Sequence, residues 1–154
     1  AAIPLVGDLS VAELALNTAD RKLFTKTAGG AVVEVSGVKA DEVNSFTAAQ
    51  RGAITALTDG ATITPDFALA NNFSVTLAGN RTLANPTNLT AGQSGSIFIT
   101  QDGTGSRTLA YGSYWDFTTG AAPVLTTTAA GVDRIDYIVR TTGSIHAVFT
   151  GDYS

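Results

Sequence analysis

The sequence predicts a mostly β fold, an antiparallel β-sandwich or barrel that follows an extended N-terminal arm, a small β-meander and one short helix. Segments with apolar residues at every second position recur from residue 59 to the C-terminus, and such alternation is typical of half-buried strands. Turn-forming residues separate these segments at a spacing of roughly 8–15 residues, as in sandwiches and barrels. We therefore expect an arm and meander in residues 1–44, a short helix or linker in 45–58, and a β-sandwich domain in 59–154.

The composition excludes several classes of protein. The 154-residue chain has a net charge of −4 and its nine lysines and arginines are scattered, so we expect no nucleic-acid binding. No apolar run approaches the ~20 residues that span a bilayer, and we expect no membrane insertion. The chain has no cysteine, which removes disulfides and thiolate metal sites.

The N-terminal residues predict an attachment module. Residues 1–12 are apolar and contain Pro4, which favours an extended arm that lies on another surface. Strands are expected between residues 13 and 36, with a turn at Gly29-Gly30. Because a unit this small buries too little surface to stand alone, it must pack on the rest of the chain or on copies of itself. The side chains that we expect at such contacts are Leu5, Leu14, Leu16, Leu23 and Phe24.

Residues 45–57 are the helix candidate. Asn44 or Ser45 can cap it, and apolar residues including Phe46 and Leu57 recur at helical spacing. Gly52 weakens the helix by ~1 kcal/mol relative to alanine.

Seven strands are predicted in the β domain. They cover residues 61–65, 72–78, 95–101, 107–111, 124–128, 132–140 and 144–150. The third and fourth strands, and the sixth and seventh, are expected to form hairpins across short turns. In the last hairpin the core side chains are expected to be Ile135, Tyr137, Val139, Ile145, Ala147 and Phe149.

The sequence indicates no catalytic residues, and we expect no enzyme activity, no cofactor and no metal ion. His146 is the only histidine, and its alternation with Ile145 places it away from the core, without a nucleophile or carboxylate at motif spacing. Asp133 and Asp136 lie three residues apart on one strand and point to opposite faces, unlike the ligands of a calcium loop. The glycine-rich residues 102–107 are interpreted as a tight loop, because a strand and not a helix follows.

Tyr114 and Trp115 leave two interpretations open. They belong to an aromatic cluster, residues 111–117, and an aromatic ring beside polar neighbours in a loop can stack on a sugar ring as a glycan-binding platform. In the alternative, Trp115 fills the end of the sandwich.

Two stretches resemble proteins of tailed bacteriophages. Residues 13–26, Glu-Leu-Ala-Leu-Asn-Thr-Ala-Asp-Arg-Lys-Leu-Phe-Thr-Lys, followed by residues 30–35, resemble a short module found in tail-fibre and other virion proteins. A series of motifs further along resembles a β-rich domain common in phage structural and fibre proteins. These motifs are residues 57–63, 77–88, 92–95, 101–109 and 122–125.

The resemblance implies a virion component, commonly a homotrimer, without catalytic residues. We expect a structural subunit on the surface of the phage particle: a capsid-decoration or cement protein, a spike or a short fibre. Its N-terminal region would attach it to other virion proteins of the capsid or tail. The alternative is a host-surface carbohydrate-binding module. A depolymerase is disfavoured because no carboxylate pair stands at a recognisable spacing.

Overall fold

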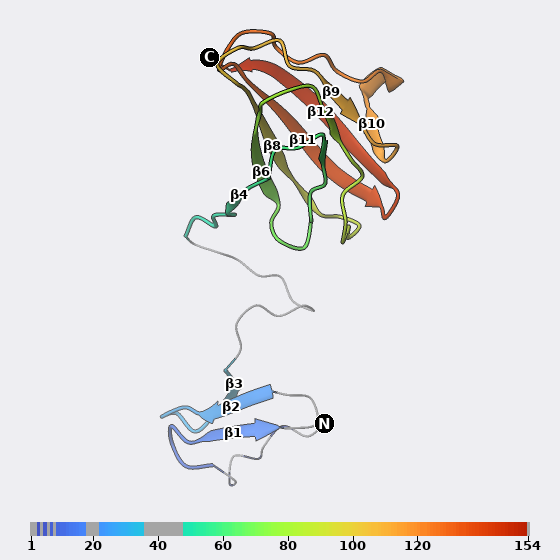
Figure 1. Cartoon of the computed structure of the whole chain (residues 1–154). Helices are drawn as coiled ribbons and strands as arrows, with labels where there is room; N and C mark the ends of the chain where they lie inside the picture. Colours follow the sequence, from blue (N-terminus) through green and yellow to red (C-terminus); the bar gives the residue numbers. More distant parts are fainter. Residues whose placement is uncertain are drawn as a thin grey trace. The chain divides into compact units, whose positions relative to one another are not determined.

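The computed structural model describes residues 3, 5, 7, 9–17, 22–35 and 48–153. The chain is mostly β, as predicted, and it divides into two compact units, residues 1–50 and residues 51–154 (Figure 1).

The N-terminal unit contains a three-stranded antiparallel sheet in the order β1-β2-β3. Its strands are β1 (Leu14–Asn17), β2 (Lys22–Lys26) and β3 (Val32–Glu34). In the turn between β2 and β3 the N–H of Gly30 donates to the carbonyl of Thr27 at 2.9 Å. Gly30 has a φ of 85°, which glycine adopts at little cost. The predicted meander with its Gly-Gly turn is therefore confirmed.

The last residues of the predicted arm lie along β2. The N–H of Ala12 donates to the carbonyl of Lys26 at 2.9 Å, and Val11 forms an isolated parallel bridge with Lys26. The ammonium group of Lys26 in turn donates to the carbonyl of Leu9 at 3.0 Å. Pro4 lies outside the described residues.

The helix predicted over residues 45–57 is wrong for the part that the structure describes. Residues 45–47 lie outside that part, residues 48–53 are not helical, and β4 (Ile54–Ala56) is a strand. It pairs in parallel with β6 (Asn72–Leu77). Backbone pairing with a neighbouring strand outweighs a helical pattern that Gly52 already weakens.

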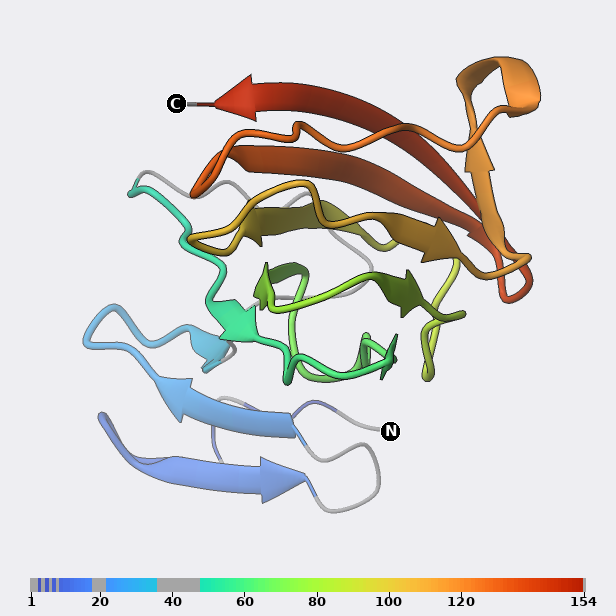
Figure 2. The same ribbon diagram turned by 45° about the horizontal axis from the view of Figure 1, so that its top comes forward.

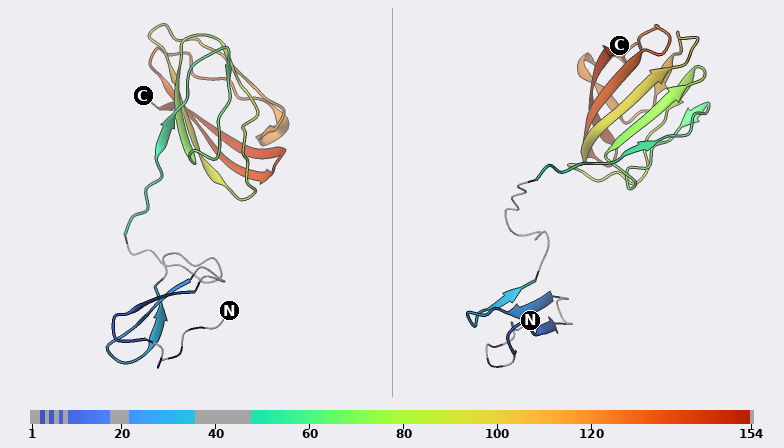
Figure 3. Two further views of the ribbon diagram at one scale, coloured as in Figure 1. Left: turned by 60° about the horizontal axis from the view of Figure 1, so that its bottom comes forward. Right: turned by 90° about the vertical axis from the view of Figure 1, so that its left-hand side faces the viewer.

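The β domain in the C-terminal unit has two sheets. The larger sheet has the order β10-β12-β11-β8-β6-β4, and the smaller sheet has the order β5-β7-β9. The remaining strands are β5 (Thr62–Ile63), β7 (Arg81–Leu83), β8 (Ser94–Gln101), β9 (Leu109–Tyr111), β10 (Trp115–Phe117), β11 (Val132–Thr141) and β12 (Ser144–Tyr153). A short 3-10 segment, Thr118–Gly120, follows β10. Figure 3 shows strands of the larger sheet side by side, from the teal β4 to the red β12.

Residues 54–111 wind between the two sheets. The strands β4, β6 and β8 are parallel neighbours in the larger sheet, and β5, β7 and β9 are parallel neighbours in the smaller one. Because the chain alternates between the sheets, these residues form three windings, each with one strand in each sheet. The β domain is thus built from mixed and parallel sheets, and antiparallel pairing is confined to the contacts of β11 with β8 and β12.

The two predicted hairpins have different outcomes. The C-terminal hairpin is confirmed, because β11 and β12 pair antiparallel across a short turn. The hairpin of residues 95–101 with 107–111 is wrong, because β8 belongs to the larger sheet and β9 to the smaller one. The loop between these strands carries the chain from the larger sheet to the smaller one instead of turning it back along the same sheet.

The strand predicted at residues 124–128 does not form. The N–H of Thr126 in this segment donates at 2.9 Å to the side chain of Asp133, a fully buried carboxylate on β11. A side-chain carboxylate therefore holds this segment in place, whereas a strand would be held by backbone hydrogen bonds to a neighbouring strand. The strands β7 and β10 were not predicted.

The hydrophobic core of the β domain takes buried side chains from both sheets, such as Phe73 and Ile97 of the larger and Ile63 and Leu83 of the smaller one; Figure 2 shows the ribbon of these strands. Phe67 stacks on Tyr137 with ring centroids 4.6 Å apart and on Phe73 at 5.7 Å. The inward residues predicted for the last hairpin are buried, except Phe149, which is partly buried. The largest fully buried apolar side chains include Phe73, Ile63, Leu77, Leu83, Ile97, Ile99, Ile135 and Ile145.

Candidate functional site

A groove of about 530 Å³ lies on the outer face of the larger sheet, over β10, β11 and β12. Asp116 stands opposite His146, which stands opposite Ile138, and in the next row Asp136 stands opposite Val148. Residues directly opposite in a sheet share a face. The groove therefore has an apolar floor between two carboxylates, with the imidazole beside one of them.

Hydrogen bonds from neighbouring strands, and for Asp136 also from its own strand, hold both carboxylates in place. The hydroxyl of Ser144 donates to Asp116 Oδ2 at 2.7 Å. The hydroxyl of Ser96 donates to Asp136 Oδ1 at 2.6 Å, and Nε of Arg134 donates to Asp136 Oδ2 at 2.9 Å. A ligand would meet acceptors whose orientation is already set, which lowers the entropic cost of binding.

The two aspartates stand at separate positions on the sheet. With strands ~4.8 Å apart and residues ~3.3 Å apart along a strand, ideal geometry places the Cα atoms of Asp116 and Asp136 ~12 Å from one another. His146 is exposed, as predicted, and the hydroxyl of Ser144 is directed to Asp116. Asp133 and Asp136 point to opposite faces, also as predicted, with Asp133 buried.

Trp115 is part of the core. Its side chain is 7% exposed, and its indole N–H donates to the carbonyl of Ala84 at 3.1 Å. The indole packs edge-on against Phe67 and Tyr137, at centroid distances of 6.4 and 6.3 Å. This is the geometry of the interpretation in which Trp115 fills the interior, and the ring is not free to stack on a sugar.

Tyr114 is half-buried beside the groove strands. Its backbone N–H donates to Oδ1 of Asn85 at 2.9 Å, and its carbonyl accepts the N–H of Ile145 at 2.8 Å. A glycan contact by its side chain stays a prediction.

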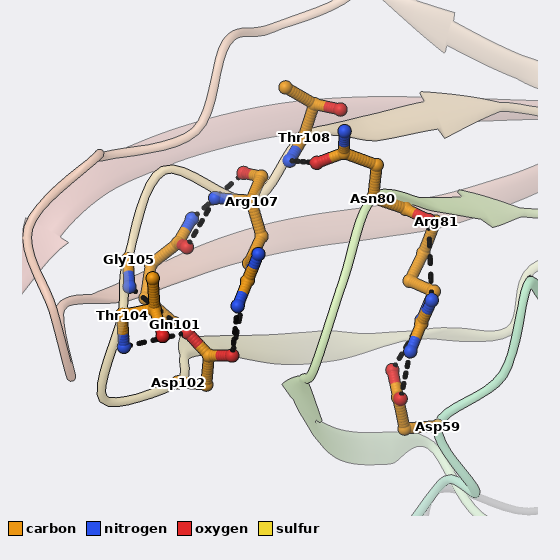
Figure 4. A network of polar contacts seen from close by, with 9 residues as sticks. All are labelled: Asp59, Asn80, Arg81, Gln101, Asp102, Thr104, Gly105, Arg107 and Thr108. Carbon is orange, nitrogen blue, oxygen red and sulfur yellow. Dashed lines mark hydrogen bonds and ion pairs between the residues drawn. The ribbon is translucent and has the colours of Figure 1, made fainter.

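Polar side chains tie the three windings together at one end of the β domain (Figure 4). Arg81 of the second winding forms a two-point contact with Asp59 of the first, Nε to Oδ1 at 2.9 Å and Nη2 to Oδ2 at 2.6 Å. This hydrogen bonding is the main cause that lowers the pKa of Asp59. Asn80 Oδ1 accepts the N–H of Thr108, in the third winding, at 3.0 Å. The contacts join loops that are distant in sequence, so their role is structural.

The glycine-rich loop between β8 and β9 is organised by Asp102 (Figure 4). Its Oδ1 accepts the N–H groups of Thr104 and Gly105 at 2.9 and 3.0 Å, and its Oδ2 is 2.8 Å from Nη2 of Arg107. The contact with Arg107 is the main cause that lowers the pKa of Asp102. Because these N–H groups already bind a carboxylate of the chain itself, the loop is not a phosphate cradle.

The residues predicted for subunit contacts divide between the two faces of the N-terminal sheet. The registers place Leu14, Leu16 and Leu23 on one face, and Phe24 on the other, where it is 4% exposed. Leu5 is exposed. We call the first face the apolar face. Its side chains are Leu14, Leu16, Leu23, Thr25, Val33 and Val35.

One signal for the windings is present in the sequence and was missed. The tetrapeptide Arg-Thr-Leu-Ala occurs at residues 81–84 and again at 107–110. Both arginines pair with an aspartate at the same end of the β domain, and both leucines enter the core. The groove had no such signal, because Asp116, Asp136 and His146 are separate in the sequence and meet only through strand pairing.

In the residues that the structure describes, no group of three or more histidines, aspartates or glutamates is placed to hold a metal ion. No helix in the same ranges is long and apolar enough to cross a bilayer.

Comparison with known proteins places the β domain in a family. The sequence pattern of the family described as "Putative phage tail fibre C-terminal domain" matches residues 63–143, slightly more than half of the chain. No curated protein and no solved structure matches the chain. The match covers the second and third windings and the groove strands β10 and β11, and it ends before β12. The chain therefore belongs to this phage tail fibre family, as a structural protein of the tail-fibre type with a place in the phage particle.

Proposed function

We propose that the chain is a homo-oligomeric, trimeric subunit on the surface of the phage particle, attached through its N-terminal unit so that the β domain projects. The observation that carries this proposal is the family match over the β domain, residues 63–143. The division into two compact units supports it, because one unit is left for attachment. The match favours a tail fibre or short fibre over a capsid-decoration or cement protein.

Localisation on purified particles tests the proposal. Antibodies against the β domain should label the tail fibres in electron micrographs. A chain that lacks residues 1–35 should be missing from particles although its β domain is made. Labelling of the capsid shell, or normal incorporation of the shortened chain, would contradict the tail attachment.

A host-surface carbohydrate is the second candidate partner, and the groove is the observation that favours it. Sugars present hydroxyl donors around apolar C–H faces, which suits fixed carboxylates around Ile138 and Val148. The test is a glycan array probed with wild type and with Asp116→Asn, using Leu69→Thr, on an exposed loop, as the control. Binding by none of the proteins removes this candidate. We propose no catalysis, and release of reducing ends from host polysaccharide would overturn that.

A further inference from the structure

The N-terminal sheet keeps its charged side chains on one face. Lys22 Nζ lies 2.9 Å from Glu34 Oε2, and Lys26 reaches the carbonyl of Leu9. The register places these charged residues on the face of Phe24, opposite the apolar face. This second face thus has an ion pair and a contact with the chain's own arm.

The apolar face is exposed. Its outer side chains are large and apolar, with exposed fractions of 62% for Leu14, 64% for Leu16, 40% for Val33 and 47% for Val35. Among the strand residues 14–17, 22–26 and 32–34, no charged side chain lies on this face. A three-stranded sheet needs a second layer over its hydrophobic face, and contiguous exposed apolar side chains mark interaction surfaces.

We propose that the apolar face is the surface through which copies of this chain associate, and that its occupants are the same faces of the sister chains, which meet around the axis of the proposed trimer. The inference rests on the proposed homo-oligomer and names its contact. A partner recognised by charge would need charged groups here. Sister chains can meet at this face without bringing like charges together, because Lys22, Lys26 and Glu34 lie on the far side.

The size of the face sets the strength of the contact. Three strands ~4.8 Å apart and about four residues long make a patch of roughly 15 by 15 Å. Stable interfaces bury about 800 Å² on each partner, several times that footprint. The association is therefore weak for each pair of faces, and the oligomer should dissociate on dilution.

Sedimentation velocity over a wide range of concentration tests the inference on the full chain. Wild type should pass from monomer to oligomer as concentration rises. The double variant Leu14→Thr, Leu16→Thr keeps strand-forming residues and should need at least about tenfold more protein to associate. The matched control, Leu69→Thr with Val124→Thr, removes similarly exposed apolar side chains from the β domain and should behave as wild type. A face variant that associates as wild type does overturns this contact alone, whereas a wild type that is monomeric throughout overturns the contact and the proposed homo-oligomer together.

A cross-link locates the contact even where the threonine variant folds poorly. The chain contains no cysteine, so Val33→Cys introduces a single thiol on the apolar face. Mild oxidation should link two chains, whereas Val124→Cys should link far fewer. Equal yields from both positions refute the face as the contact. The result is independent of location on the particle: a tail-fibre protein that fails the cross-linking test keeps its proposed place and loses only this contact.

Discussion

Gln101 pairs its side-chain amide with the backbone of Arg107 as a neighbouring strand would. Its Nε2 donates to the carbonyl of Arg107 at 3.0 Å, and its Oε1 accepts the N–H of Arg107 at 2.8 Å. Gln101 is buried at the end of β8, where the chain leaves the larger sheet. The amide thus satisfies two backbone groups that strand pairing does not reach at the crossing between sheets.

Replacing Gln101 by leucine should destabilise the β domain. The substitution keeps an apolar stem but leaves the N–H and carbonyl of Arg107 without these partners, at an expected cost of about 2–4 kcal/mol. Urea unfolding followed by tryptophan fluorescence measures the loss through Trp115. Thr104→Ala, in the same loop but exposed, is the control and should unfold near the wild-type midpoint. An unchanged midpoint for Gln101→Leu would show that water replaces the amide.

Tyr111 and Tyr137 should respond differently to the loss of their hydroxyl groups. The hydroxyl of Tyr137 donates to the carbonyl of Asn71 at 2.8 Å. The hydroxyl of Tyr111 is the one buried side-chain polar atom without a hydrogen-bond partner in the described part of the chain. We expect Tyr137→Phe to cost about 1 kcal/mol and Tyr111→Phe to be neutral or stabilising. The urea midpoints of the two variants measure these changes in stability, and a larger loss of stability for Tyr111→Phe than for Tyr137→Phe would contradict the expectation.

The same two phenols predict a loss of stability in alkali. Burial raises the pKa of Tyr137 to about 12, and burial chiefly raises that of Tyr111. Because the folded pKa lies above the unfolded value of about 10, this contribution is complete below pH 10 and is lost as the pH rises towards the folded pKa. Between pH 10 and 12 the unfolding free energy of Tyr137→Phe should fall less steeply than that of wild type. If the unfolding free energies of the two proteins fall in parallel with pH, the ionisation of Tyr137 does not cause the loss of stability in alkali.

Acid should weaken the contact between the first two windings. The contact with Arg81 lowers the pKa of Asp59, so its contribution is present above the unfolded pKa of about 4 and disappears as the pH falls through the folded pKa. Asp59→Asn should therefore unfold at lower urea than wild type at neutral pH. The two midpoints should converge in acid. If the difference between the two urea midpoints stays constant with pH, the loss of stability in Asp59→Asn comes from packing and not from the charge of Asp59.

Local and non-local pairing explain how much of this fold could be predicted. The β11–β12 hairpin followed from alternation around Ile135 and Ile145 and a turn nearby in the chain. The windings depend on parallel pairs such as Arg81 with Leu109. These residues are distant in the sequence, so a short window of it does not reveal that they pair.

The contact residues show the same division. Leu14, Leu16 and Leu23, all predicted as subunit contacts, lie on one face of the sheet, but Phe24 follows Leu23 directly and must point to the opposite face. Alternation alone could have separated them. The groove depends on the neighbourhood of β10 and β12, a parallel pair that the sequence did not indicate.

Gly95 should be the glycine that tolerates substitution least. A methyl group there would collide with the carbonyl of Asn71, which is backbone and cannot turn away, and would press on the hydroxyl of Tyr137. Gly95→Ala should therefore separate β8 from the end of the first winding and cost roughly 3 kcal/mol or more. Gly103→Ala is the matched control, because a methyl group at that position meets nothing within 4 Å. Thermal unfolding of the two variants should show a large loss for Gly95→Ala and little change for Gly103→Ala. Equal stability would mean that the chain around Asn71 moves aside, and the close packing of the windings inferred here would be wrong.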